Sequence, residues 1–292
     1  MTMSIPDLRA IVKQALKEDL GAGDITTRLL FPKAIQAKAV IQTKQEGVLA
    51  GLPVAKAVFK QVDPKLRFKP IVRDGDRVKP GMIVAHLHGD GRSILKGERV
   101  ALNFLQHLSG VATLTAKFVE AVKGTNAIIL DTRKTTPGLR RLEKYAVRMG
   151  GGRNHRFGLD NGILIKDNHL ALIASVPMAV RLARTGARSR LKVEVEVTSL
   201  DQVKVALAVG ATAVLLDNMS IAELREAVTL VNGRVFTEAS GGITLANVRD
   251  VAATGVNAIS IGALTHSAPS VDICLDIEKT VWGNTKKTRR KV

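Results

Sequence analysis

Apolar and polar positions follow two different periods along this chain, and the change between them divides the sequence in two. Residues 5–19 carry apolar side chains at helical spacing on one face and charged side chains on the other, which predicts an opening amphipathic helix. Residues 54–62 predict a second helix. Short strand-like runs surround it, punctuated by turn pairs such as Asp74-Gly75 and Pro80-Gly81, at residues 37–42, 47–50, 66–72 and 82–87. This first part is typical of a small α/β layer structure with an antiparallel sheet.

From about Lys96 the pattern becomes a regular alternation of strands and helices. Two helices come first, over residues 98–108 and 113–122. Six apolar runs then predict strands at residues 128–130, 163–165, 193–197, 213–216, 234–238 and 258–261. The helices between and after them are predicted at residues 139–149, 176–183, 200–209, 221–231 and 245–253. Such alternation indicates a parallel α/β barrel or a doubly wound sheet. A last alternating run, residues 271–277, predicts a strand that returns to the small domain.

The composition suits strands that are buried on both faces. Of 292 residues, 46% are hydrophobic but only 3% aromatic, and Ala, Val, Leu and Ile dominate. That length is enough for one large domain and a smaller one. Cys274 is the single cysteine of the chain, so no intrachain disulfide can form.

The net charge of +18 attracts anions without specifying nucleic acid. Five of the basic residues lie in the last eight positions, which we expect to be a solvated tail: Lys286, Lys287, Arg289, Arg290 and Lys291. No nucleic-acid-binding motif or set of stacking aromatics accompanies them, so we expect no nucleic-acid partner. No run approaches the ~18 apolar residues of a membrane span, and residues 1–20 are rich in charge. We therefore expect no membrane partner and a cytoplasmic location.

Cationic residues gather after the first two predicted barrel strands, each where an apolar element meets a loop: Arg133, Lys134, His155, Arg156 and Lys166. Arg and Lys are rarely buried without an anionic partner. Since the carboxyl ends of parallel strands meet at one end of a barrel, these residues predict a pocket for a multiply anionic small molecule. The alternative is a solvated basic surface, against which the glycines at 150–152 and the apolar residues 163–165 argue.

The later strands add glycine pairs and carboxylates. Ser240-Gly241-Gly242 and Gly262-Ala263 each lie before an expected helix, where backbone N–H groups suit a phosphate. Glu196 and Asp217 could ligate Mg²⁺ or accept hydrogen bonds from sugar hydroxyls, and a salt bridge is the alternative. Glu194 faces the same side of its strand as Glu196, and we prefer Glu196 because it lies nearer the carboxyl end. Together these residues favour substitution at an activated sugar carbon.

These motifs, in this order, resemble the quinolinate phosphoribosyltransferase family, the carboxylating nicotinate-nucleotide pyrophosphorylases. The resemblance covers nearly the whole chain, and its most specific piece is GGGRNHRFGLDNGILIKDNH, from Gly150 to His169. Other matching pieces are EDLGAGDITT from residue 18, GVLAG from 47, ERVALNF from 98, LSGVAT from 108, EVE from 194, LDN from 216, SGG from 240 and GALTHS from 262.

The resemblance implies an α/β fold with two domains. Residues 106–269 would form an open parallel α/β barrel of the type II phosphoribosyltransferase kind. Residues 1–105 would form an N-terminal α/β sandwich domain, which the C-terminal segment 270–292 joins. The resemblance also implies a homodimer with shared active sites. It implies a pentosyltransferase of NAD biosynthesis, which transfers phosphoribosyl from phosphoribosyl pyrophosphate to quinolinate with decarboxylation. The products would be nicotinate mononucleotide, pyrophosphate and carbon dioxide, and Mg²⁺ would accompany the substrate.

Matching motif positions implies roles for individual residues. Three would hold the quinolinate carboxylates: Arg133, His155 and Arg156. Lys134 and Lys166 would face phosphate or pyrophosphate oxygens, and Glu196 and Asp217 would serve the ribose and Mg²⁺; these four form the expected catalytic set. Arg99 would enter the neighbouring subunit's site. The remaining expected substrate-binding residues, most of them in the 5′-phosphate cradle, are Thr132, Ser240, Gly241, Gly242, Ile261, Gly262, Ala263 and His266.

Three alternatives remain open from the sequence. A paralogue associated with molybdenum transport shares the fold, but the intact runs at residues 154–156 and 165–169 favour the enzyme. A Schiff-base aldolase would use Lys134 or Lys166 as its nucleophile, and the density of Arg and the carboxylates count against it. A nucleic-acid-binding protein is the alternative that is not an enzyme.

Overall fold

The computed structural model describes residues 5–173, 175–186 and 191–278. The chain divides into two compact units, one comprising Met1–Gln106 with Val271–Val292 and the other His107–Ser270. The basic tail residues 286–291 lie outside the described residues. None of the described helices combines the length and the apolar character needed to cross a membrane.

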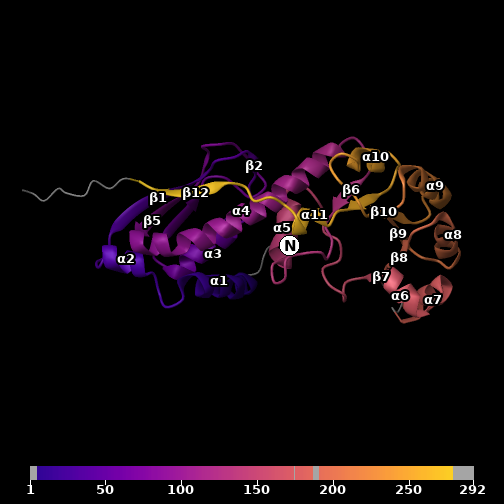
Figure 1. Ribbon diagram of the computed structural model, residues 1–292, viewed down its shortest axis with the longest axis horizontal. Helices are drawn as coiled ribbons and strands as arrows, with labels where there is room; N and C mark the ends of the chain where they lie inside the picture. Colours follow the sequence, from indigo (N-terminus) through magenta and orange to yellow (C-terminus); the bar gives the residue numbers. More distant parts are fainter. Residues whose placement is uncertain (1–4, 174, 187–190, 279–292) are drawn as a thin grey trace, which may run out of the picture. The chain divides into compact units, whose positions relative to one another are not determined.

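The first unit is built on a four-stranded antiparallel sheet in the order β12-β1-β5-β3. Its strands are β1 (Gln36–Thr43), β3 (Arg67–Pro70), β5 (Ile83–Asp90) and β12 (Ile273–Ile277). The yellow β12 runs beside the indigo β1 in Figure 1, with Ile41 opposite Leu275. The C-terminal strand thus belongs to the first unit. A second, two-stranded sheet pairs β2 (Gly47–Val48) with β4 (Arg77–Val78).

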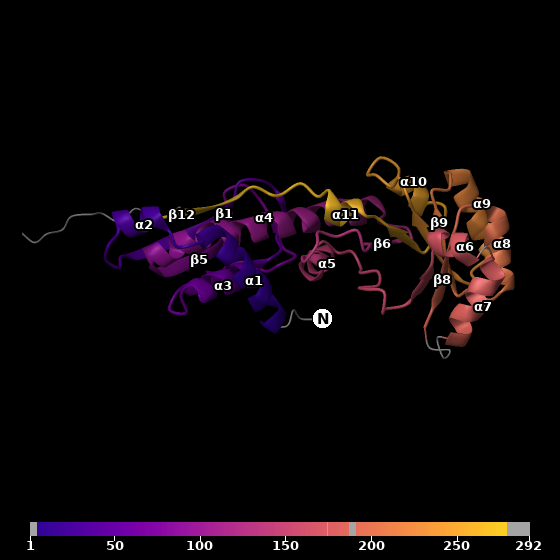
Figure 2. The ribbon, with the colours of Figure 1, turned by 60° about the horizontal axis from the view of Figure 1, so that its bottom comes forward.

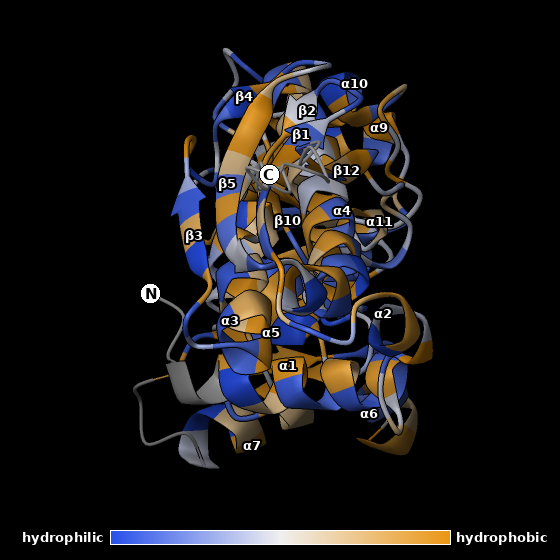
Figure 3. Ribbon diagram, turned by 90° about the vertical axis from the view of Figure 1, so that its left-hand side faces the viewer, coloured by the Kyte–Doolittle hydropathy of each residue, from blue (hydrophilic) through white to orange (hydrophobic). Residues whose placement is uncertain are grey.

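Three helices accompany these sheets: α1 (Ile5–Leu20), α2 (Ile25–Leu30) and α3 (Leu52–Val62). Figure 3 colours α1 with both orange and blue residues, as the sequence pattern predicts for an amphipathic helix. Its buried positions, Leu8, Val12 and Leu16, follow helical spacing. Helices α1 and α3 pack against each other, and Phe59 of α3 is fully buried.

A single helix, α4 (Gly91–Ala121), replaces the two predicted over residues 98–108 and 113–122, so that prediction was wrong. Ser109 and Gly110, where the break was expected, are both buried inside the helix. A side chain at Gly110 would collide with the backbone carbonyl of Pro269. The glycine therefore serves a close approach of two backbone segments and not a turn.

The second unit is a parallel sheet of six strands in the order β6-β11-β10-β9-β8-β7. The strands are β6 (Ile128–Leu130), β7 (Ile163–Ile165), β8 (Val193–Val197), β9 (Ala213–Asp217), β10 (Phe236–Ser240) and β11 (Ala258–Ser260). β6 and β7 are its two edges, and no pairing between them occurs in the described residues. This unit confirms the predicted open parallel α/β barrel.

The helices of this unit are α5 (Arg140–Met149), α6 (Asp167–Ile173), α7 (Val176–Gly186), α8 (Leu200–Ala208), α9 (Ile221–Val231), α10 (Val248–Ala252) and α11 (Ala263–His266). Figures 1 and 2 both show α7, α8 and α9 along one side of strands β8 and β9. Strand β8 shows how the sequence follows this arrangement. Val193, Val195 and Val197 are buried, whereas Glu194 and Glu196 on the opposite face are half-buried.

Two element boundaries differ from the prediction because side chains bond to nearby backbone. Arg234 donates to the carbonyls of Leu230 and Val231 at the end of α9, so β10 begins two residues later than expected, at Phe236. Asn247 accepts the Thr244 N–H and donates to the Gly242 carbonyl, which holds residues 242–247 as a turn. Helix α10 accordingly begins at Val248 instead of residue 245.

A buried ion pair at the end of β6 anchors the loop after α5. Asp131 is fully buried and receives a hydrogen bond from the Lys144 ammonium group, which lies on α5. The Asp131 carboxylate also accepts the His155 N–H at 2.9 Å and the Asn154 side-chain N–H at 2.5 Å. Lys144 donates in addition to the His155 carbonyl at 3.0 Å. Burial raises the pKa of Asp131 and lowers the pKa of Lys144, because desolvation outweighs their mutual attraction.

Replacing one member of this pair should destabilise the fold strongly. Lys144→Met leaves the Asp131 charge buried without its partner, and we expect a loss of about 3–5 kcal/mol in the free energy of unfolding. Adding Asp131→Asn should recover part of the loss, since the residues are coupled. Urea denaturation followed by circular dichroism measures both. Lys204→Met, which removes an exposed ion pair with Asp201, is the control and should change little. Equal effects of the two Lys→Met variants would contradict the anchoring role.

Candidate active site

A pocket of about 610 Å³ lies at the carboxyl ends of the parallel strands of the second unit. It brings together most of the residues predicted from the sequence: Thr132, Arg133, Lys134, His155, Arg156, Lys166, Glu196, Asp217, Ser240, Gly241 and Gly242. These come from the ends of β6, β7, β8, β9 and β10 and from the loop after α5. The order of strands in the sheet, not closeness in the sequence, therefore assembles the site.

Two arginines in the pocket lack partners for part of their guanidinium groups. The Nε atoms of Arg133 and Arg156 are buried and form no hydrogen bond with the described residues. Arg156 uses Nη1 to donate to the Gly162 carbonyl at 3.0 Å. Burial lowers the pKa of Arg156, and the nearby Arg133 charge adds to that effect. Buried donors normally have acceptors, so this corner of the pocket suits an anion with several oxygens.

The two predicted carboxylates come from neighbouring strands and have different surroundings. Glu196 on β8 lies 3.4 Å from the Lys166 Nζ, so the salt bridge that the sequence left open is present there. Burial raises the pKa of Glu196, Lys166 opposes this, and the Asp217 charge adds to the rise. Asp217 accepts a hydrogen bond from the Asn218 side chain at 2.7 Å and forms no ion pair within the described residues. Two repelling carboxylates in a half-buried pocket offer the oxygen donors that Mg²⁺ prefers.

The Gly241-Gly242 turn brings backbone into the pocket. Both glycines have positive φ, 91° and 62°, which other residues adopt only with strain. A Cβ atom at Gly241 would collide with the Asn218 side chain. The Ser240 carbonyl accepts the Asn218 N–H at 2.9 Å, which ties this turn to the end of β9. Such a turn exposes backbone N–H groups where a phosphate can approach.

Five predicted residues do not line this pocket. Arg99 is an exposed residue of α4 in the first unit. Ile261 is buried, and its N–H bonds the Leu130 carbonyl. Gly262 is the N-cap residue of α11, which begins at Ala263, and His266 ends the helix as an exposed residue.

Helix α11 nevertheless lies beside the pocket. A Cβ at Gly262 would come within 3.0 Å of the Lys134 side chain, and the Thr265 hydroxyl donates to the Lys134 carbonyl at 2.7 Å. This helix therefore positions Lys134.

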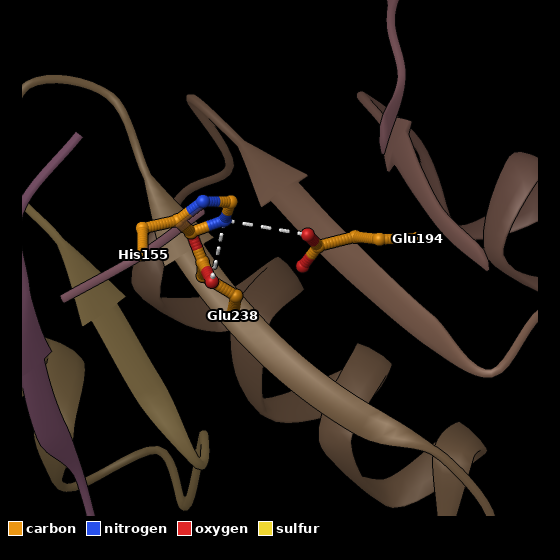
Figure 4. A group of neighbouring side chains, drawn as sticks. All are labelled: His155, Glu194 and Glu238. Carbon is orange, nitrogen blue, oxygen red and sulfur yellow. Dashed lines mark ion pairs between the residues drawn. The ribbon is translucent and has the colours of Figure 1, made fainter. Parts of the chain in front are cut away.

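The structure adds a partly buried cluster, of which only Glu238 is fully buried, that the sequence does not indicate. Figure 4 shows His155 between Glu194 of β8 and Glu238 of β10, with its Nε2 3.4 Å and 3.5 Å from their Oε2 atoms. His155 was expected to hold a substrate carboxylate, but here it faces two protein carboxylates. The sequence favours Glu196 over Glu194 as a site residue, whereas in the structure Glu194 pairs with His155. Glu238 is the last residue of the strand predicted over residues 234–238, and the sequence carried no signal that its carboxyl group would be buried at the pocket wall. Further lining residues are Leu164, Asp167, Leu215, Asn218 and Ser260.

Family models match both units of the chain. The model described as quinolinate phosphoribosyl transferase, C-terminal domain, matches residues 111–276, and the N-terminal domain model matches residues 24–109.

Individual relatives are similar over most of their length. A "Probable nicotinate-nucleotide pyrophosphorylase (carboxylating)" of Bacillus subtilis (strain 168) is 43% identical over 92% of this chain and 93% of its own. A chloroplastic nicotinate-nucleotide pyrophosphorylase (carboxylating) of Oryza sativa subsp. japonica is 41% identical over 93% of this chain and 78% of its own. The solved structure of the nicotinate-nucleotide pyrophosphorylase from Francisella tularensis superposes with a TM-score of 0.90 at 39% identity, covering 95% of this chain and 98% of that one. Together with the two domain models, these similarities show that the chain belongs to the quinolinate phosphoribosyl transferase family.

Proposed function

We propose that this chain is a carboxylating nicotinate-nucleotide pyrophosphorylase. It transfers the phosphoribosyl group of phosphoribosyl pyrophosphate to quinolinate and releases nicotinate mononucleotide, pyrophosphate and carbon dioxide, a step of NAD biosynthesis. The observation that carries the proposal is the pair of buried, unpartnered Nε atoms of Arg133 and Arg156 in a pocket that also holds the carboxylates of Glu196 and Asp217 and a glycine turn. That combination suits a rigid organic dianion beside a phosphorylated sugar.

Quinolinate binds through Arg133 and Arg156 in this proposal. Guanidinium groups match carboxylates with two parallel hydrogen bonds, whereas a lysine ammonium offers only a point charge. The free Nε atoms supply donors that no described protein group uses. His155 contributes to the same end of the pocket, although its Nε2 is directed at Glu194 and Glu238.

Phosphoribosyl pyrophosphate occupies the opposite side of the proposed site. Lys134 and Lys166 face its phosphate oxygens, and the turn at Ser240–Gly242 receives the 5′-phosphate. Glu196 and Asp217 face the ribose and stabilise positive charge that develops on its reacting carbon. The same two carboxylates fit Mg²⁺, which when bound would neutralise charge on the pyrophosphate leaving group.

Decarboxylation follows from the first step. Attack of the ring nitrogen on the sugar carbon makes the ring cationic, and the adjacent carboxylate can then leave as carbon dioxide. Family membership and the named relatives support this reaction over the Schiff-base aldolase and the molybdenum-transport paralogue. A cytoplasmic location and the absence of a nucleic-acid partner stay predictions from the sequence.

We propose further that the enzyme is a homodimer whose active sites are shared. Arg99 lies on α4 in the first unit and does not line the pocket of the second unit. An isologous dimer allows each subunit to lend its Arg99 to the partner's pocket.

Arg133→Ala and Arg156→Ala should each weaken quinolinate binding by about 2–5 kcal/mol, because a buried carboxylate then loses its cationic partner. Isothermal titration calorimetry with quinolinate measures the change. Arg153→Ala is the matched control, since its exposed side chain does not line the pocket, and it should bind as the unaltered protein does. Unchanged affinity in both pocket variants would refute the assignment.

Glu196→Gln and Asp217→Asn should leave quinolinate affinity nearly intact but slow turnover by about 10²-fold or more, since these groups serve the sugar and the metal. Steady-state rates at saturating Mg²⁺ and both substrates test this. Asp201→Asn, on the exposed face of α8, should have no effect. If the two pocket variants turn over as fast as this control, the carboxylates are only structural.

Arg99→Ala and Lys134→Ala should each be nearly inactive alone. After mixing and subunit exchange, each heterodimer has one pocket with both lesions and one with neither, so about a quarter of the normal activity should return. Native mass spectrometry of size-labelled subunits confirms the exchange. Heterodimers without activity would mean that Arg99 acts within its own chain.

A further inference from the structure

The cluster of His155, Glu194 and Glu238 has chemistry that the proposed substrate contacts do not use. Its three ligand atoms lie within 4.8 Å of one another and come from the loop after α5, from β8 and from β10. Figure 4 shows the imidazole ring facing both carboxylates. His155 and Glu238 also line the pocket, so the cluster is in reach of whatever occupies it.

The hydrogen bonding of His155 distinguishes between two possible uses of this cluster, binding a metal ion and holding protons. Its Nδ1 accepts the Arg156 backbone N–H at 2.8 Å, so the ring proton lies on Nε2, toward the two carboxylates. A metal ion on Nε2 would require the proton on Nδ1, where it would meet the Arg156 N–H. The arrangement is therefore suited to holding protons and poorly suited to holding a metal ion.

Glu238 is the member best placed to carry a proton of its own. Its side chain is 3% exposed; Oε2 faces the His155 ring, and Oε1 is buried without a hydrogen bond among the described residues. An unpartnered carboxylate oxygen is costly to bury, whereas a neutral carboxyl group costs far less.

Several groups face Glu238 from the neighbouring elements. Glu194 on β8 and Asp131 at the end of β6 disfavour its charge, and His155 and Ser260 of β11 favour it. Asp131 is itself paired with Lys144. Burial is the largest effect and, with Glu194, raises the pKa of Glu238 to about 7.

The proposed reaction needs a proton at one defined atom. Once the ring nitrogen carries the ribose, the bond between C2 and its carboxylate breaks, and its electron pair stays on C2 as carbon dioxide leaves. C2 must then gain a proton, or the carbanion recaptures carbon dioxide. This step rests on the proposed function.

We propose that Glu238 is the acid that protonates C2, and that the carboxyl proton it delivers is taken up when the dianionic substrate binds. The O–H bond of Glu238 breaks, the electron pair on C2 forms the new C–H bond, and Glu238 is left as a carboxylate. A proton from solvent restores the acid before the next turnover. His155 is a positioning residue in this step, because its Nε2 proton lies between Glu238 and Glu194 and fixes the orientation of both.

Proton uptake on binding has a defined pH dependence. A dianion beside Glu238 disfavours its charged form and raises its pKa above the value in the free protein. At about pH 8 the free carboxyl is mostly ionised, so binding should take up close to one proton. At about pH 6 it is already protonated, and uptake should fall toward zero.

Calorimetric titration of quinolinate in HEPES and in imidazole buffers counts these protons from the dependence of the observed enthalpy on the buffer. Glu238→Gln should bind quinolinate about as tightly as the unaltered protein at pH 6 and up to about tenfold more tightly at pH 8, and it should lose the uptake, since a neutral amide neither titrates nor needs a proton to bind. Glu238→Asp keeps a titratable carboxyl and should keep the uptake. Glu143→Gln is the matched control, because Glu143 is a buried carboxylate with a histidine partner, His107 at 2.9 Å, outside the pocket. Uptake that is absent in the unaltered protein, or unchanged in Glu238→Gln, would overturn the proposal.

A single-turnover measurement separates this inference from the proposed function. The unaltered enzyme and Glu143→Gln should release pyrophosphate and carbon dioxide from quinolinate and phosphoribosyl pyrophosphate. Glu238→Gln should release pyrophosphate but form carbon dioxide about 10²-fold more slowly, with the undecarboxylated nucleotide accumulating. Equal release of both products by Glu238→Gln would refute the role of Glu238 and leave the proposed function standing. No pyrophosphate release by the unaltered protein would refute both.

Discussion

The buried carboxylate of Asp131 is the contact on which the rest of the site depends. It lies at the end of β6 and binds three separate groups: the Lys144 ammonium of α5, the Asn154 side chain and the His155 N–H. The loop after α5 has no regular secondary structure of its own at these positions. This carboxylate therefore helps to hold the loop, together with the backbone hydrogen bonds that join Arg153 to residues 129–131. Because His155 and Arg156 follow directly, these contacts also fix where those two side chains enter the pocket.

The pocket separates charges that would otherwise neutralise each other. Arg133 and Arg156 keep buried donors unused, whereas Lys166 is already paired with Glu196 and His155 with Glu194 and Glu238. The anionic substrate can thus find free partners at the arginines while the acidic groups remain in place for the sugar, the metal and the proton. A site with only basic residues would bind anions equally well but could not stabilise a cationic sugar carbon.

The sequence predicted the barrel well because its strands are short apolar runs with polar ends. Strands β6, β7 and β8 and helix α9 have the predicted bounds. Side-chain hydrogen bonds of Arg234 and Asn247 explain why β10 and α10 begin later than predicted. The spacing of apolar residues gives no indication of these bonds.

The sequence could predict those site residues that follow the ends of predicted strands. Order along the chain was enough to bring the cationic residues and the carboxylates to one pocket, but it gave no sign that Glu238 would be buried beside His155. Burial of a single carboxyl depends on which strands are neighbours, and β10 and β8 both border β9, although residues 198–235 separate them in the chain. The two predicted helices at residues 98–122 failed for a similar reason. Gly110 meets a backbone segment that lies more than 150 residues further along the chain.

The central claim is that this pocket joins quinolinate to a phosphoribosyl group and then removes one defined carboxylate. The most direct measurement uses quinolinate carrying labelled carbon in either the 2-carboxylate or the 3-carboxylate. The account predicts labelled carbon dioxide from the 2-labelled compound alone, and only when phosphoribosyl pyrophosphate and Mg²⁺ are both present. Release without phosphoribosyl pyrophosphate, release from the 3-carboxylate, or no release under any of these conditions would contradict it.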